Sequence, residues 1–332
     1  MKNLNMTLAS ADYDRIRPLW DGGVQAEGLE LNMLLLPVEE IFFRMARFQE
    51  FDACEMSLAS YLISKSMGKP RFTAIPVFPS RKFRHADVYI NSNSKIKNPE
   101  DLQGGKIGTP EYQMTACVWM RGILEEFYGV KADEVHWFSG GTETPGREER
   151  LKLNLPSQFK VSKISDDTTL FEMLRQGEID AVFTARVPSP YVRGEAWITR
   201  LFPNSKEVEQ NYYQETKIFP IMHTVVLKEE VYEKYPWAAQ SLYKAFCQAK
   251  KLCFERIDSS AALPVTLPWF NYELDNTRAL MGTDFWAYGL EANRKVLNKI
   301  IEYMHKQGLL PLEFDPTLED LFAPNTLSNF GV

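Results

Sequence analysis

Short apolar runs that alternate with helical patterns constrain the fold of this chain more than any other feature of its sequence. The segments typical of strands or of helix faces are residues 3–8, 29–36, 51–56 and 72–78 for strands, and 38–48 and 58–67 for helices. Strands that take turns with helices predict a mostly parallel sheet with helices on its faces. The sequence therefore predicts an α/β fold.

The alternation starts again after a polar stretch at residues 91–98 and runs to about residue 184, where another predicted strand ends. A strand at 218–227 and a helical C-terminal region follow. We therefore expect a discontinuous first lobe, 1–90 plus 218–332, and a second lobe, 91–217. Lobes joined by two crossings can close on a ligand, which we expect in the cleft between them, at the carboxyl ends of the strands.

Composition excludes several classes of function. The net charge of −6 over 332 residues, with no basic stripe, argues against nucleic-acid binding. No apolar run reaches the roughly 18 residues of a membrane span, and the N-terminal residues lack the unbroken apolar run of a secretory signal. The four cysteines form no Cys-x-x-Cys pair and are expected to be buried thiols, so we expect a cytoplasmic protein.

Polar residues follow the predicted strands of the first lobe. Arg15 and Arg17 come after the first strand, in a loop expected to face the cleft. Glu55 ends a strand, where it could accept a hydrogen bond from a ligand hydroxyl or help bind a metal. Ser57 and Ser60 open the next helix and are either ligand donors or ordinary helix caps.

A basic run at residues 80–85 follows another strand. Arg81 and Arg84 have the forked geometry that clamps a carboxylate, and His85 is the best candidate proton donor, because histidine titrates nearest neutral pH. The alternative interpretation is a solvated basic turn. We expect His85→Ala to abolish turnover without preventing folding.

The second lobe offers a strand-to-helix junction at residues 109–115. Tyr112, Gln113 and Thr115 lie at the predicted helix N-terminus, which suits a carboxylate, although the same residues could simply start a helix well. Thr184 and Arg186 end the last strand of this lobe and are expected to touch a ligand from the opposite side.

His223 lies in an apolar strand, where a histidine is either a core residue or a catalytic one. The four histidines show no metal-binding spacing, so the sequence predicts no metal site and no cofactor. A divalent metal stays open, because Glu55, His85 and His223 could converge in space.

Five stretches are distinctive motifs: KIGTPEYQMTACVWMRGIL at 106–124, GGTETPGR at 140–147, FPSRKFRH at 78–85, EMSLASY at 55–61 and YDRIRPL at 13–19. They resemble the 4,5-dihydroxyphthalate decarboxylase family. The resemblance covers about the first 150 residues well.

This resemblance implies a two-lobed fold like that of type II periplasmic binding proteins, each lobe a mostly parallel sheet flanked by helices. It also implies a carboxy-lyase that decarboxylates a hydroxylated aromatic dicarboxylate, such as 4,5-dihydroxyphthalate, without a cofactor. Arginines and a helix N-terminus would hold the carboxylates, His85 would protonate the ring, and Glu55 and His223 would assist. Such an enzyme would serve phthalate catabolism.

Two alternatives remain from the sequence. The first is a non-catalytic solute-binding protein for a small organic anion, which would use the same arginines. The second is another enzyme of this fold, such as a menaquinone-pathway lyase or a thiamine-pyrimidine synthase relative, which lacks the quoted motifs. The expected partner is a small aromatic or organic acid, with no nucleic acid and no membrane; a homo-oligomer stays open.

Overall fold

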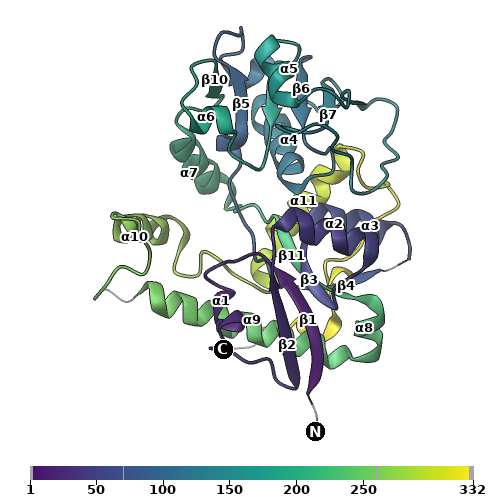
Figure 1. The fold of residues 1–332 in the computed structure, drawn as a ribbon, viewed down its shortest axis with the longest axis vertical. Helices are drawn as coiled ribbons and strands as arrows, with labels where there is room; N and C mark the ends of the chain where they lie inside the picture. The colour runs from purple at the N-terminus through teal and green to yellow at the C-terminus, as the bar shows by residue number, and fades with distance from the viewer. Residues whose placement is uncertain (1–2, 70, 259–260, 329–332) are drawn as a thin grey trace. The chain divides into compact units, whose positions relative to one another are not determined.

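A computed structural model describes residues 3–69, 71–258 and 261–328. The chain forms two compact units, which we describe separately (Figure 1). The first comprises Met1–Arg81, His223–Leu297 and Asp315–Val332, and the second comprises Lys82–Met222 and Asn298–Phe314. The crossings thus lie at residues 81/82 and 222/223, where we expected 90/91 and 217/218, and residues 298–314 belong to the second unit.

The sheet of the first unit has the strand order β2-β1-β3-β11-β4. Its strands are β1 (Leu4–Ser10), β2 (Leu29–Leu35), β3 (Ala53–Ser57), β4 (Phe72–Ile75) and β11 (His223–Lys228). β1 runs parallel to β2 and β3, whereas β11 runs antiparallel to both of its neighbours. The helices of this unit are α1 (Arg17–Trp20), α2 (Val38–Phe48), α3 (Leu58–Ser66), α8 (Glu229–Lys234), α9 (Pro236–Ile257) and α10 (Phe270–Met281).

The sheet of the second unit has the order β10-β5-β9-β6-β7-β8. Its strands are β5 (Val88–Asn91), β6 (Lys106–Thr109), β7 (His136–Ser139), β8 (Lys160–Lys163), β9 (Ala181–Phe183) and β10 (Ile198–Arg200). β5 runs antiparallel to both of its neighbours, β9 and β10, and the other neighbouring strands are parallel. The unit's helices are α4 (Thr115–Tyr128), α5 (Leu170–Gln176), α6 (Ser189–Val192) and α7 (Ser205–Thr216); most of α11 (Arg294–Lys306) also belongs to it.

The two sheets share one topology, although the sequence shows no repeat. The order β7-β6-β9-β5-β10 reproduces β2-β1-β3-β11-β4, and β8 is added at one edge. In each sheet the antiparallel strand is the first to follow a crossing of the chain, β5 in one and β11 in the other. Each sheet therefore has one strand that runs opposite to the others.

The first sheet has a topological switch point between β1 and β3, because β1 is followed by β2 on one side while β3 lies on the other. Ser10 ends β1 and Ser57 ends β3. The antiparallel strand β11 begins at the same edge, since its first residue, His223, pairs with Ser57. Three segments far apart in the sequence thus meet where α/β proteins bind ligands.

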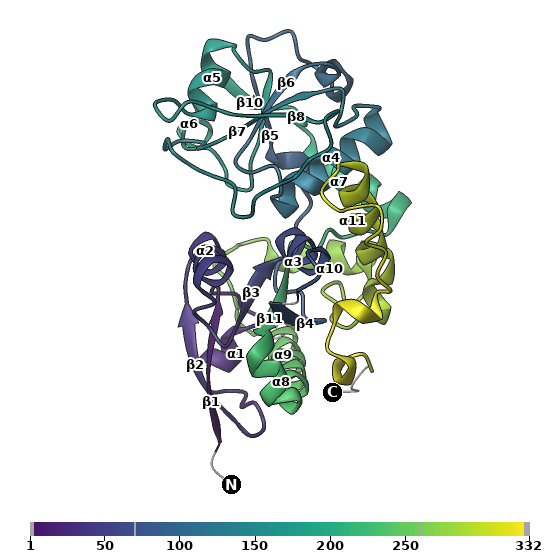
Figure 2. The ribbon, with the colours of Figure 1, turned by 90° about the vertical axis from the view of Figure 1, so that its right-hand side faces the viewer.

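Helices cover the first sheet, with α2 packed against β1 and β3 and α8 against β4 and β11 (Figure 2). In the described part of the chain, no helix is long and apolar enough to cross a membrane. All four cysteines are free; Cys54, Cys117 and Cys253 are buried, as expected, whereas Cys247 is only partly buried.

Candidate functional site

A buried carboxylate lies at the switch point of the first unit. Glu55, on β3, is fully buried and accepts four hydrogen bonds. Oε1 accepts from the Tyr13 hydroxyl at 2.7 Å and from His223 Nδ1 at 2.5 Å. Oε2 accepts from the Ala11 N–H at 3.0 Å and the Ser10 hydroxyl at 3.3 Å. The β1–α1 loop, β3 and β11 thus converge on one side chain.

These partners keep Glu55 ionised. Burial by itself would raise the pKa of the carboxyl, but the nearby His223 and the hydrogen bonds from His223, Ala11 and Tyr13 outweigh it and leave the pKa below its ordinary value. Burial and the Glu55 charge raise the pKa of Tyr13, so its hydroxyl stays a donor at neutral pH. The first unit therefore holds a buried anion next to an imidazole.

Glu55 fixes the orientation of His223. The Nδ1–H donates to the carboxylate, so Nε2 is the ring nitrogen that remains for proton exchange. Phe42 packs edge-on against the imidazole, with ring centroids 4.8 Å apart. The His223 side chain is 14% exposed, and no described residue hydrogen-bonds to Nε2. A carboxylate–histidine pair of this kind can donate or accept a proton.

Helix α3 starts directly after β3, next to this pair. Ser57 is its N-cap and accepts from the backbone N–H of Ser60 at 3.4 Å, while the two hydroxyls are 3.2 Å apart. Because Ser57 pairs with His223 in the sheet, α3 starts directly after the residue that lies opposite His223. A helix N-terminus suits an anion such as a carboxylate.

The predicted arginines of the first unit already have protein partners. Arg15 stacks between the rings of Tyr13 and Trp286, and its Nε donates to the carbonyl of Pro79 at 2.8 Å. Arg17 is 53% exposed and pairs with Asp12 at 2.6 Å.

Arg81 and Arg84 also bond within their own units. Arg81 donates to the Ala287 carbonyl at 2.7 Å and to the Asn293 side chain. Arg84 pairs with the buried carboxylate of Asp87 at 2.8 Å, which also pairs with Lys82 at 2.8 Å. Carboxylate binding by these arginines stays a prediction.

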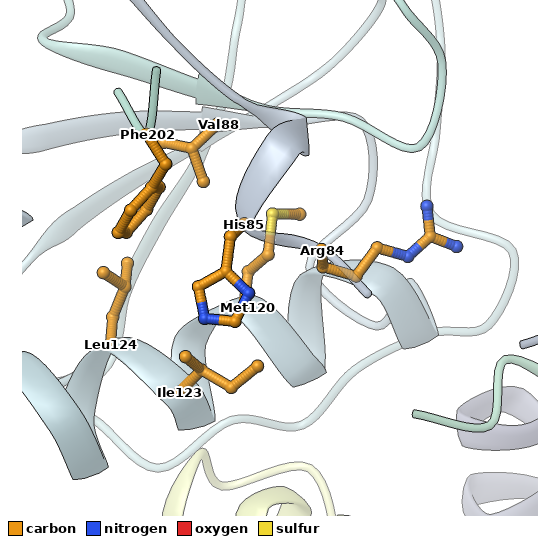
Figure 3. A pocket seen from close by; sticks show the side chains of 7 residues that line it. All are labelled: Arg84, His85, Val88, Met120, Ile123, Leu124 and Phe202. Carbon is orange, nitrogen blue, oxygen red and sulfur yellow. The ribbon is translucent and has the colours of Figure 1, made fainter. Parts of the chain in front are cut away.

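His85 belongs to the second unit and lies among apolar side chains (Figure 3). The residues around it are Arg84, Val88, Met120, Ile123, Leu124 and Phe202. The imidazole is almost completely buried, and burial lowers its pKa to about 4. Nδ1 has no hydrogen-bond partner among the described residues. His85 is therefore neutral at pH 7, and its role as proton donor stays a prediction.

This burial makes the stability of the protein depend on pH. Between pH 6.5, the ordinary pKa of histidine, and about pH 4, His85 is protonated in the unfolded chain but not in the folded chain. The free energy of unfolding therefore falls as the pH falls through this range. We expect His85 to account for about 2 kcal/mol of the loss between pH 7 and pH 5. Urea titrations should show a correspondingly weaker pH dependence for His85→Leu.

The matched control is His136→Gln, which replaces a histidine that hydrogen-bonds to Ser162 on the neighbouring strand. It should keep the wild-type pH dependence. If the free energy of unfolding had the same pH dependence in the wild type and in His85→Leu, burial would not lower the pKa of His85.

The junction of β6 and α4 carries a second cluster of charges. Arg147 and Arg150 both donate to Glu111 Oε1, at 2.6 and 2.9 Å, and Glu111 is buried. Gln113 donates to Glu149 at 3.0 Å. Burial raises the pKa of Glu149, and the hydrogen bonds from Gln113 and from the Tyr112 N–H oppose this rise.

The other predicted residues of the second unit lie near the same sheet edge. Thr115 is the first residue of α4, and the Tyr112 hydroxyl donates to the Gln307 carbonyl at 3.2 Å. Thr184 follows β9 and donates its N–H to the Asp87 carbonyl, and the N–H of Arg186 donates to the Thr184 hydroxyl, both at 3.2 Å.

The structure thus brings Glu55, His223 and Ser57 together in one unit, and it assigns His85 and the residues of the β6–α4 junction to the other. Sequence reasoning missed Tyr13 and Arg150. Tyr13 lies in the motif YDRIRPL, which could have pointed to it; Arg150 had no such signal. No group of three potential metal ligands occurs among the described residues.

Comparison with known proteins agrees with the motifs. The chain is 40% identical to a 4,5-dihydroxyphthalate decarboxylase of Comamonas testosteroni over 332 residues, which is 100% of both chains. The chain belongs to the 4,5-dihydroxyphthalate decarboxylase family. A second family member, from Pseudomonas putida, is 42% identical over 214 residues, covering 64% of this chain and 83% of the relative. No protein-family model matches the sequence.

Solved structures identify the fold of this decarboxylase-family chain. The alkanesulfonate-binding protein SsuA from Xanthomonas axonopodis pv. citri, bound to MOPS, matches with a TM-score of 0.51 at 11% identity, covering 98% of both chains. A putative periplasmic sulfonate-binding protein from Methylobacillus flagellatus matches with a TM-score of 0.50 at 12% identity, covering 97% of this chain and 92% of that one. The predicted type II periplasmic-binding-protein fold is confirmed.

Proposed function

We propose that this protein decarboxylates a hydroxylated aromatic dicarboxylate such as 4,5-dihydroxyphthalate, and that Glu55 and His223 form its proton-transfer pair. The observation that carries the proposal is the hydrogen bond from His223 Nδ1 to the buried carboxylate, which leaves Nε2 for the substrate. The names of both curated relatives support the substrate class.

The reaction needs a proton on the ring carbon that carries the departing carboxylate. When the ring hydroxyl para to that carbon loses its proton, the ring can accept a proton at carbon and become a dienone. The bond to the carboxylate then breaks, its electron pair restores the aromatic ring, the oxygen regains its proton and CO₂ leaves. In sum, one carboxylate and one proton become a C–H bond and CO₂.

We assign the proton at the ring carbon to His223 Nε2. Glu55 holds the imidazole and balances its charge when it is protonated. The N-terminus of α3, with Ser57 and Ser60, binds a substrate carboxylate next to the imidazole. The ring hydroxyls supply the electron density that cofactors supply in other decarboxylations, so we propose a reaction without a cofactor.

In the second unit, taken by itself, the N-terminus of α4 is the element best suited to bind a carboxylate. Gln113 and Thr115 lie at this helix start, and two arginines, Arg147 and Arg150, pair with Glu111 beside it. We propose carboxylate binding for this cluster as well.

A non-catalytic binding protein is the second candidate, because the solute-binding proteins compared above share the fold. Such a protein needs anion-binding groups but has no use for an oriented histidine on a buried carboxylate. The Glu55–His223 pair therefore favours the enzyme.

One assay separates the two functions. We expect purified protein incubated with 4,5-dihydroxyphthalate to release CO₂ and a dihydroxybenzoate, at the same rate with and without a chelator. Loss of turnover with the chelator would replace the metal-free mechanism with a metal-assisted one. Tight binding without CO₂ release, measured by calorimetry, would support the binding protein instead.

A further inference from the structure

The loop between β1 and α1 contributes a third residue, Tyr13, to the Glu55–His223 pair. It was not identified as a site residue from the sequence. The Tyr13 hydroxyl donates to Glu55 Oε1 at 2.7 Å. This is the same oxygen that accepts the His223 Nδ1–H, at 2.5 Å. The two donors therefore share one acceptor atom, and the strength of one bond depends on the other.

The ring of Tyr13 is held in place independently of Glu55. The Arg15 guanidinium lies over it, 4.3 Å from the ring centroid, and also over the Trp286 ring, at 4.0 Å. Arg15 is fixed in turn by its bond to the Pro79 carbonyl. The Tyr13 side chain thus has contacts besides Glu55, which include a hydrogen bond with Ser80.

We propose that Tyr13 is a positioning residue for decarboxylation, which fixes the Glu55 carboxylate so that His223 presents Nε2 to the substrate. The inference rests on the proposed function. Tyr13 has no direct role with the substrate: its hydroxyl is directed at Oε1 and acts through Glu55. Without it, Oε1 loses one of its two donors, and the carboxylate can rotate about its remaining partners.

The test is Tyr13→Phe, which removes only the hydroxyl. We expect kcat to fall about 10- to 100-fold, as for the loss of a hydrogen bond to a charged group, while KM changes by less than about threefold. A loss confined to kcat separates positioning of the catalytic pair from a general disturbance of binding.

Nuclear magnetic resonance supplies a readout that needs no turnover. The His223 Nδ1 proton lies in a short hydrogen bond and should resonate far downfield. In Tyr13→Phe, Oε1 loses its second donor and the geometry of this hydrogen bond changes, so the resonance should move.

Tyr61→Phe is the matched control. Tyr61 is a buried tyrosine of the same unit whose hydroxyl donates to the Leu321 carbonyl, away from Glu55. It should change neither kcat nor the resonance. Equal kcat values and an unmoved resonance in Tyr13→Phe would overturn the inference. If the wild type shows no turnover but the resonance still differs between the wild type and Tyr13→Phe, the proposed function is refuted. The coupling of Tyr13, Glu55 and His223 would then still hold.

Discussion

Replacing His223 with asparagine is expected to lower kcat for decarboxylation by about 10²- to 10⁴-fold, the usual contribution of a general acid. Asparagine keeps a donor that can reach Glu55 but offers no group that can release a proton at neutral pH. The fold should persist, because the His223 side chain is partly exposed and β11 keeps its backbone pairing. Product formation under saturating substrate, with circular dichroism as a check on folding, measures this effect.

Two parallel variants make the result specific. His136→Asn changes a histidine on β7 and should leave kcat unchanged. His85→Asn decides between the two candidate histidines. If His85→Asn abolishes turnover while His223→Asn remains active, the proton donor is His85, as first expected from the sequence, and the Glu55–His223 pair is structural.

Replacing Glu55 with glutamine should have the second largest effect, a loss in kcat of about 10²-fold or more. The amide of glutamine has no negative charge to balance a protonated imidazole. Its NH₂ group is a donor, and it would face the donors that bond to the Glu55 carboxylate in the wild type. The ring of His223 then loses its fixed tautomer. Glu55→Asp is the matched control, since it keeps the charge and should retain more activity than the glutamine variant.

The same substitution has a signature in stability. The folded-state pKa of Glu55 lies below its ordinary value, so ionisation of Glu55 stabilises the folded protein at neutral pH, and this contribution is lost as the pH falls through the folded-state value. In Glu55→Gln this acid-side loss should disappear. Urea unfolding at several acidic pH values measures this loss. If the free energy of unfolding falls with pH as steeply in Glu55→Gln as in the wild type, Glu55 is not ionised in the folded state.

The alternation of strands and helices in the sequence was sufficient to predict an α/β fold with two lobes. It missed β5, a strand of four residues whose pairing with β9 joins residues about 90 positions apart. It also extended the final strand back to residue 218, whereas β11 starts at His223, after Pro220. Short strands and strand ends depend on long-range partners, which local patterns do not contain.

Candidate residues were found because polar side chains at strand ends and family motifs are visible in a sequence. Glu55, Ser57 and His223 were all identified in this way. Their roles were harder to predict: the basic run favoured His85, whose imidazole the fold buries among apolar side chains with a pKa of about 4. Burial is decided by distant elements such as α4, and the sequence near His85 does not reveal it.

The sequence by itself therefore determined the kind of fold, the family and the chemical types present at the strand ends. Only the tertiary structure decided which of them act together. Glu55 and His223 are 168 positions apart, and Tyr13 is 42 positions from Glu55. They meet because β11 returns to the first sheet beside β3, and this strand order results from the packing of the whole unit. Hydrogen bonds and pKa values depend on such neighbours, so they follow from the fold and not from any local pattern.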